Sequence, residues 1–237
     1  DSIWIGTDNG IYRYDGSEFT LFPLDSDEDG TKYSINCIYL TSDDKLYVGT
    51  DNYGLYVYDN GAFNRVAETY NLGVSTINAM YEDDKDQLWL ASSSGIYYLT
   101  SDGVKMVDDE GISGYNIGNI SGYDGTIYAT ANNDVLIRVD ENGEITVTSK
   151  SSYGIDDINS LYIDENGTRY YGSAGYSILT INSKGKVGVI STGSLHGINK
   201  IYNDGEKIWI LADDGVGYIT SGNKIVNVES LRFNEST

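Results

Sequence analysis

Short stretches of alternating apolar and polar residues recur along the chain and are separated by turns rich in Asp, Asn and Gly. One part of the chain contains four of them in a row, at Ile35–Leu40, Lys45–Gly49, Leu55–Tyr58 and Ala62–Val66. A period of two is typical of strands that bury one face, and the Asp-Asn-Gly turn after the third stretch is a strong hairpin signal. The pattern therefore predicts four antiparallel strands joined by short turns.

The second strand of each such unit carries an aromatic residue ahead of a small-residue turn. These aromatics are Trp4, Tyr47, Trp89, Tyr128, Tyr170 and Trp209, separated by 43, 42, 39, 42 and 39 residues. A period near forty built from strand-like units is the signature of a β-propeller with one blade per repeat. We predict an all-β fold, a single β-propeller domain over residues 1–237 with six four-stranded blades, in which these aromatics pack between blades. The repeats cover approximately residues 3–44, 45–86, 87–124, 125–166, 167–205 and 206–237.

The two ends of the chain differ in the phase of the repeat. The sequence starts on a second strand, Ile3–Gly6, and ends on a segment that matches a first strand, Leu231–Phe233. Pairing of N- and C-terminal strands would complete one blade and remove two open sheet edges. We predict that the propeller is closed in this way; the alternative is that the chain is a fragment of a longer array.

Two phrases carry a family resemblance. They are Ile3-Trp-Ile-Gly-Thr-Asp-Asn-Gly-Ile-Tyr-Arg-Tyr-Asp15 and Leu46-Tyr-Val-Gly-Thr-Asp-Asn-Tyr-Gly-Leu-Tyr-Val-Tyr-Asp59. They resemble the two-component regulator propeller repeat, and the third copy, Gln87–Tyr97, fits as well. Copies four to six depart from it, since Thr130 and Leu211 replace the strand-end glycine and Arg169 replaces the first apolar residue. Family members commonly have seven blades, which six repeats do not match.

This resemblance covers the whole chain, and it implies a bacterial sensor propeller located in the periplasm or outside the cell. Such propellers are normally fused to signalling output domains, for example histidine kinases or diguanylate cyclases, and relatives often sense glycans. The chain itself contains none of that signalling machinery.

The charge of the chain narrows the range of partners. It has 36 acidic and 15 basic residues, a net charge of −21 and an isoelectric point of about 4.1. Such a surface repels nucleic acid and anionic membranes, so we expect neither as a partner. Cationic ligands, divalent ions and neutral polar ligands remain compatible with it. Cys37 is the single cysteine, so no disulfide can form within the chain.

Two families of loops are predicted to share one face: those between successive blades and those between second and third strands. Function in repeat folds usually resides on such loops. Their aromatic side chains could stack on a sugar among Asp and Asn donors and acceptors; a solvated acidic rim is the alternative. The candidate ligand-binding residues are Tyr33, Tyr53, Tyr70, Tyr115, Tyr153, Tyr176 and His196.

Four first strands carry an asparagine at the same position, at Asn36, Asn78, Asn159 and Asn199, while Gly118 and Glu229 stand there in the other two repeats. Because the first strand is innermost in a propeller, these amides could surround one mouth of the central channel and bind a polar ligand or water. The alternative is that each amide satisfies the backbone of a nearby loop.

Asp25, Asp27 and Asp29, followed by Gly30, match the opening of a calcium-binding loop, in which clustered carboxylates surround a hard cation. The bidentate glutamate expected at the twelfth position is missing, because Asn36 stands there. The motif therefore predicts at most weak calcium binding; the alternative is a solvated acidic loop.

No constellation of residues points to catalysis. The chain has one histidine and one cysteine, no glycine-rich phosphate loop with lysine, and no acidic pair that stands out among its 36 acids. We predict no catalytic residue and no cofactor other than weak calcium. The predicted function is a ligand-binding sensor module for a polar small molecule such as an oligosaccharide. The alternatives are a protein-interaction scaffold that docks a basic partner, and a glycan lyase or hydrolase.

Overall fold

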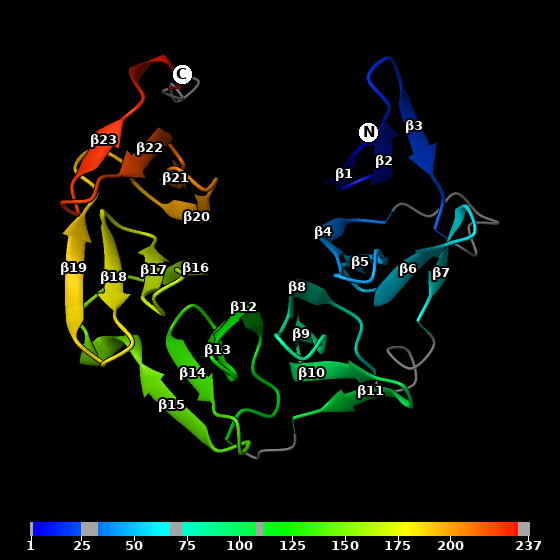
Figure 1. Ribbon diagram of the computed structural model, residues 1–237, viewed down its shortest axis with the longest axis horizontal. Coiled ribbons are helices and arrows are strands. Elements are labelled where there is room, and N and C mark those ends of the chain that lie inside the picture. The colour runs from blue at the N-terminus through cyan, green and yellow to red at the C-terminus, as the bar shows by residue number, and fades with distance from the viewer. Residues whose placement is uncertain (1, 25–32, 67–72, 108–110, 232–237) are drawn as a thin grey trace. The chain divides into compact units, whose positions relative to one another are not determined.

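The computed structural model describes residues 2–24, 33–66, 73–107 and 111–231, which form β-strands and two short 3-10 turns. Six antiparallel sheets follow one another along the chain (Figure 1). Five have four strands and the first has three. The predicted all-β fold with six blades is confirmed. The closure of the propeller and its single-domain character stay predictions, and the chain divides into two compact units, Asp1–Ile120 and Ser121–Thr237.

Blades one to three run in chain order. Their strands are β1 (Ile3–Thr7), β2 (Gly10–Tyr14) and β3 (Phe19–Phe22); β4 (Ile35–Leu40), β5 (Leu46–Thr50), β6 (Leu55–Asp59) and β7 (Ala62–Arg65); β8 (Ile77–Glu82), β9 (Leu88–Ser92), β10 (Gly95–Thr100) and β11 (Gly103–Met106).

Blades four to six repeat the same order, with the 3-10 turns η1 (Lys150–Ser152) after β15 and η2 (Glu229–Leu231) after β23. Their strands are β12 (Ile117–Tyr123), β13 (Thr126–Ala131), β14 (Val135–Val139) and β15 (Ile145–Ser149); β16 (Ile158–Ile163), β17 (Arg169–Ser173), β18 (Ser177–Ile181) and β19 (Val187–Ser191); β20 (Ile198–Asn203), β21 (Ile208–Ala212), β22 (Gly215–Ile219) and β23 (Ile225–Asn227).

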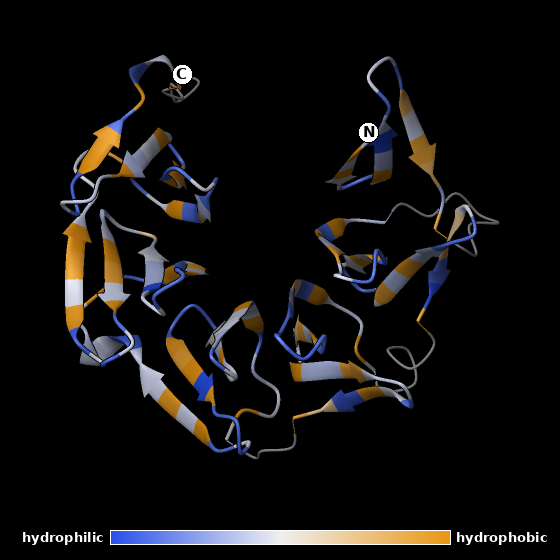
Figure 2. Ribbon diagram, in the orientation of Figure 1, coloured by the Kyte–Doolittle hydropathy of each residue, from blue (hydrophilic) through white to orange (hydrophobic). Residues whose placement is uncertain are grey.

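Apolar and polar residues alternate along most strands, as the sequence pattern predicts (Figure 2). The hairpin between β6 and β7 shows how the turns form. Asp59 pairs with Ala62 across a two-residue loop, and both loop residues, Asn60 and Gly61, have positive φ angles of 51° and 89°. Two left-handed residues in succession match the twist of the flanking strands, and Asn-Gly adopts them at the lowest steric cost.

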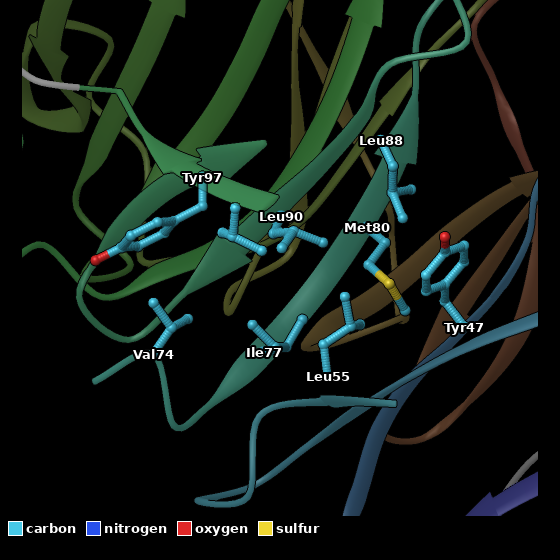
Figure 3. Packing of buried hydrophobic residues seen from close by; sticks show 9 residues of the cluster. Tyr47, Leu55, Val74, Ile77, Met80, Leu88, Leu90 and Tyr97 are labelled. Atoms are coloured by element: carbon cyan, nitrogen blue, oxygen red, sulfur yellow. The ribbon is translucent and has the colours of Figure 1, made fainter. Parts of the chain in front are cut away.

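Apolar side chains of neighbouring blades pack together, which is how a repeat that cannot bury both faces alone becomes stable. In the first unit, Tyr47 and Leu55 of blade two pack with Ile77, Met80 and Leu90 of blade three, and all five are buried (Figure 3). The aromatic of the second strand thus lies in an inter-blade core, as predicted for Tyr47. Tyr170 has the same position in the second unit and is buried with Ile198 and Ile210.

Two of the half-buried second-strand aromatics, Trp89 and Trp209, are held by an aspartate in the preceding turn. The indole nitrogen of Trp89 donates to Asp83 at 2.9 Å, and that of Trp209 donates to Asp204 at 2.7 Å. The other carboxylate oxygen of each aspartate accepts backbone N–H groups of its own turn, as in Asp204 with Glu206 and Lys207, both at 2.8 Å. One aspartate therefore stabilises both the turn and the ring.

These bonds predict a pH dependence. The bond from Trp209, with the two backbone bonds, lowers the pKa of Asp204 from 3.8 to about 2. The ionised carboxylate therefore stabilises the folded protein above pH 3.8, and this stabilisation is lost as the pH falls towards 2. We expect the free energy of unfolding in urea to fall less steeply between pH 5 and pH 3 in Asp204→Asn than in the unaltered chain. Glu206→Gln, which removes an equal charge without the Trp209 bond, is the matched control. Equal slopes for Asp204→Asn and the unaltered chain would contradict the assignment.

The two ends of the chain partly match their predicted roles. Blade one has no first strand among the described residues, as the phase of the repeat indicates. At the other end, Leu231 lies in the 3-10 turn η2 and not in a strand, while residues 232 and 233 lie outside the described residues. Glu229 also belongs to η2, so it does not occupy a first-strand position. The amide of Leu231 instead bonds to the carbonyl of Val228 at 2.9 Å.

Candidate functional site

The four repeated asparagines share a structural role that the sequence did not predict. In each of β4, β8, β16 and β20, the pairing with the second strand skips one residue directly after an isoleucine. That residue is a β-bulge, which re-aims a side chain and interrupts the ladder locally. The bulged residues are Asn36, Asn78, Asn159 and Asn199.

The contacts of these asparagines differ from blade to blade. The amide nitrogen of Asn78 donates to the carbonyl of Ile117 at 2.7 Å and to the side chain of Asn116 at 2.9 Å, so it satisfies the start of the next blade. Asn199 donates to Asp213 in the turn after β21 at 2.6 Å. Asn36 is exposed and Asn159 is half-buried. Asn78 and Asn199 therefore follow the alternative in which the amide satisfies a nearby loop.

The candidate aromatics of the first unit lie mostly in packing positions. Tyr33 is only 5% exposed and packs edge-on against Tyr53, with ring centroids 4.5 Å apart. Its ring centroid also lies 6.1 Å from that of Tyr56, so Tyr33 is part of the apolar core of blade two. Tyr53 and Tyr115 are half-buried. Tyr70 lies outside the described residues, as do Asp25, Asp27 and Asp29 of the predicted calcium loop.

The second unit brings Tyr176 and His196 together. Tyr176 is 56% exposed, and its ring lies 5.0 Å from the imidazole ring of His196 with an angle of 56° between the planes. Tyr153, the third aromatic candidate of this unit, is half-buried against the apolar cluster of blades four and five. Tyr176 and His196 are therefore the aromatic pair among the described candidates whose rings meet at the surface.

Tyr176 and His196 line a cleft of about 540 Å³. Its walls come from four loop segments: η1, the residues before β16, the turn between β17 and β18, and the residue two positions before β20. Backbone bonds connect these segments, since Ala174 donates to Asp157 at 2.6 Å and Gly197 donates to Gly175 at 3.1 Å. The cleft is thus formed by segments at the ends of β-strands, and these backbone bonds join the segments to one another. It is lined by Lys150, Ile155, Asp156, Asp157, Ala174, Gly175, Tyr176 and His196.

Charge in and around the cleft is mostly negative. Lys150 is its one cation among the described lining residues, and its ammonium group pairs with Asp157 and lies 3.9 Å from Asp134. The bond to Asp157 raises the pKa of Lys150, so the ammonium form of this lysine is favoured. The ion pairs of Lys150 are with Asp157 and Asp134, and the carboxylate of Asp156 adds a further negative charge to the lining of the cleft. The cleft is therefore suited to hydroxyl or ammonium groups and disfavours anions.

Carboxylates also fix the positions of the cleft's backbone. The carboxylate of Asp156 lies directly against Gly175, where any side chain would collide with it. On the far side of His196, its amide donates to Asp214 at 3.0 Å, and its Nδ1 lies 3.7 Å from Asp213. Tyr176 is 56% exposed beside the exposed His196, so part of its ring is accessible for stacking.

A second cleft, of about 460 Å³, lies between blades two and three at the turns that precede β5 and β9. Its polar groups bond mainly to one another. Ser42 donates to both oxygens of Glu82, at 2.7 and 3.1 Å, and to Asp86 at 3.2 Å, while Lys45 pairs with Asp43 at 2.7 Å. The described lining residues include no exposed aromatic ring. It therefore offers less to a ligand than the Tyr176 cleft.

Sequence reasoning missed part of the Tyr176 cleft. Tyr176 and His196 were candidates because they lie on predicted rim loops, and the structure brings these two together. Lys150 and Asp157 were not singled out, because one lysine and one aspartate in an acid-rich chain carry no periodic signal. Across the described residues, no group of three His, Cys, Asp or Glu side chains has the geometry of a metal site, and no helix is long and apolar enough to span a bilayer.

Comparison with solved structures places the chain among β-propellers. It is similar to the extracellular domain of the hybrid two-component system BT3049 of B. thetaiotaomicron, with 16% identity over 99% of this chain and 34% of that chain and a TM-score of 0.78. The corresponding domain of BT4673 from B. thetaiotaomicron gives 20% identity, 96% and 35% coverage, and a TM-score of 0.74. The chain thus spans about a third of those two chains. The fold resemblance inferred from the repeat phrases is confirmed.

Other propellers are also similar. Virginiamycin B lyase from Staphylococcus aureus, in a catalytically inactive form with quinupristin, has 15% identity over 96% of this chain and 87% of that chain, with a TM-score of 0.71. No protein-family model matches the chain, and no curated protein matches it. At these identities the likeness concerns the fold, because propellers carry many unrelated activities.

Proposed function

We propose that this chain is a ligand-binding propeller module of a bacterial signal-transduction protein, and that it binds a polar small molecule, an oligosaccharide, in the Tyr176 cleft. The observation that carries the proposal is the exposed ring of Tyr176, held against His196 in a cleft lined by carboxylates. Aromatic faces stack on the apolar faces of sugar rings, and carboxylates accept bonds from hydroxyl groups. The size of the cleft, about 540 Å³, lies within the usual range for small-molecule sites.

The fold comparison supports the cellular context of the proposal. The two B. thetaiotaomicron neighbours are extracellular domains of hybrid two-component systems. We propose a corresponding location for this chain, in the periplasm or outside the cell, with a signalling output domain in the same protein. A ligand that binds one conformation of the protein more tightly than another would shift the equilibrium between them. This shift would carry the signal from the propeller to the output domain.

Thermal unfolding of the purified chain tests the ligand class. The probes are short neutral oligosaccharides of hexoses and pentoses, their amino-sugar and uronic-acid counterparts, and calcium alone in a separate sample. A ligand at about 100 times its dissociation constant stabilises the protein by roughly 2.7 kcal/mol, which raises the midpoint by about 2–4 °C per kcal/mol for a chain of this size. We expect a shift with neutral or amino sugars and none with uronic acids.

Tyr176→Ala should weaken binding of the sugar found in this way about tenfold. The change removes a stacking contact of about 0.5–1.5 kcal/mol together with the apolar area that the ring covers. Titration calorimetry measures the affinity. Tyr202→Ala is the matched control, because Tyr202 is also exposed (57%) but lies on β20 outside the lining of the cleft. Equal weakening by both variants would exclude the Tyr176 cleft as the site.

The scaffold alternative predicts a different salt response. The net charge of −21 would attract a basic protein, and that attraction falls steeply as salt screens it. Stacking on a neutral sugar changes little with salt. Absence of any sugar effect, together with salt-sensitive binding of a basic protein, would favour the scaffold over the sensor.

A further inference from the structure

The carboxylate of Asp156 lies against the residue that precedes Tyr176. A Cβ atom on Gly175 would lie 2.9 Å from the carboxylate carbon of Asp156, and still closer to one of its oxygens. The φ angle of Gly175 is outside the left-handed region, so its backbone conformation does not require glycine. The close approach of the carboxylate does require it. The missing side chain at Gly175 thus makes room for a negative charge in the same cleft as the exposed ring of Tyr176.

A second carboxylate lies against a glycine on the His196 side of the ring pair. A Cβ atom on Gly197 would lie 2.7 Å from the carboxylate carbon of Asp213. Asn199 donates to this carboxylate at 2.6 Å, and the backbone amide of His196 donates to Asp214 at 3.0 Å. Both donors are neutral groups. They fix the positions of the two carboxylates without cancelling their negative charge.

Carboxylates therefore outnumber cations around the ring pair. Lys150 is the one cation among the described lining residues, and its ion pairs are with Asp157 and Asp134. One ammonium group thus meets two carboxylates, and Asp156 and the two carboxylates on the far side of the rings add to the negative charge. A cleft lined by charge of one sign concentrates ligands of the opposite sign. The exposed ring of Tyr176 acts in the same direction, because the face of a tyrosine attracts a cation.

We propose that the Tyr176 cleft selects sugars that carry a primary ammonium group over neutral sugars of the same shape. This inference rests on the sugar site proposed above and names the class of sugar that the site takes. The ring of Tyr176 stacks on the sugar, and the carboxylate of Asp156 accepts a charge-assisted hydrogen bond from the ammonium group. Acetylation of the amine removes both its charge and two of its three N–H donors, so an acetylated sugar loses this contact.

Matched sugars test the selectivity on the unaltered chain. The probes are disaccharides of glucose, glucosamine and N-acetylglucosamine with one linkage, and the corresponding galactose series. Titration calorimetry below the pKa of the sugar amines measures their affinities. We expect the amine of each series to bind about tenfold more tightly than its neutral and acetylated counterparts, because it gains a charge-assisted hydrogen bond and a cation–π contact. Raising the salt concentration should reduce this ratio and leave the affinity for the neutral sugars unchanged.

Asp156→Asn tests the residue that recognises the ammonium group. The amide keeps the shape of the side chain and loses its charge, so the ratio of amine to neutral affinity should fall to about threefold or less. Glu165→Gln is the matched control, because it removes an equal charge from an exposed residue in the turn between β16 and β17, at the end of blade five away from the cleft. The control should leave the ratio unchanged.

The possible failures can be told apart. Equal affinity for the amine and neutral sugars would overturn the inference and leave the sugar site intact. A similar fall of the ratio in Asp156→Asn and Glu165→Gln would also overturn it, because the preference would then come from the net charge of the chain. Absence of binding by every sugar of both series, charged or neutral, would instead contradict the proposed function, and this inference with it.

Discussion

Leu90→Ala should destabilise the folded protein by about 4 kcal/mol, within the range of 2–5 kcal/mol typical of buried leucines. Leu90 is completely buried at the third position of β9 and packs with Ile77 and Met80 of its own blade and Tyr47 of the preceding one (Figure 3). Removing three of its carbons loses their transfer energy and leaves a cavity between two blades, which the backbone of both sheets prevents from collapsing. The midpoint of thermal unfolding should fall by roughly 8–16 °C.

Circular dichroism during heating and urea titration of both proteins measure the effect. The matched control is Leu40→Ala, because Leu40 has the same side chain, also lies on a strand of this unit and is 61% exposed. The control should change the free energy of unfolding by less than about 0.5 kcal/mol. If the two variants lost similar stability, the inter-blade core of Figure 3 would not be the main source of cohesion between these blades.

The fold could be predicted because its signal is repeated. An aromatic residue ahead of a small-residue turn recurs six times at intervals near forty, and each copy carries hairpin signals at the same places. Such consistency fixes strand number and blade number even where single copies depart, as at Arg169 and Thr130. The end of the chain has no such support. Only one weak match indicated a strand at Leu231, where the structure has a 3-10 turn.

The site could be predicted only in part, because exposure depends on packing that loop position does not determine. Tyr33 and Tyr176 were both candidates on rim loops, yet Tyr33 is in the core and Tyr176 is at the surface. The difference lies in their neighbours: Tyr33 meets Tyr53 and Tyr56, whereas Tyr176 meets His196 alone among the described aromatic rings. These contacts join segments far apart in the sequence, and no local pattern encodes them.

For the repeated asparagines, the sequence showed the recurrence but not its structural reason. Their spacing revealed that one position of the first strand is special, and the structure shows that this position is a β-bulge. A bulged residue leaves the ladder, so a polar side chain that bonds to a nearby loop is favoured there. Asn78 illustrates this, since it bonds to the backbone of Ile117. The repetition therefore reflects blade geometry, and it does not by itself require a ligand.

Gly172→Val should destabilise the protein by about 3 kcal/mol, at the upper end of the range for overpacked cores. Gly172 is the strand-end glycine of β17, and it lies directly against Ile198 of β20, the first strand of blade six. A Cβ atom at this position would lie 2.6 Å from the Cγ2 of Ile198 and 2.9 Å from its Cβ, and it would collide with the hydroxyl of Ser160. Ile198 is completely buried, and Ser160 donates to its carbonyl at 3.1 Å, so neither can move without breaking other contacts.

The expected fall in the midpoint of thermal unfolding for Gly172→Val is roughly 6–12 °C, with Gly172→Ala intermediate because it adds only the first of the colliding atoms. Gly222→Val is the matched control. Gly222 is exposed in the turn before β23, and the nearest atom to its Cβ is the hydroxyl of Thr220 at 3.9 Å, so valine fits there without a clash. If backbone flexibility were the only reason for glycine at these positions, Gly172→Val and Gly222→Val would lose similar amounts of stability. A large loss of stability at Gly172 alone means instead that the short distance between Gly172 and Ile198 requires a glycine at this strand end. The glycine that recurs at the ends of second strands in the sequence would then be explained by the packing of neighbouring blades.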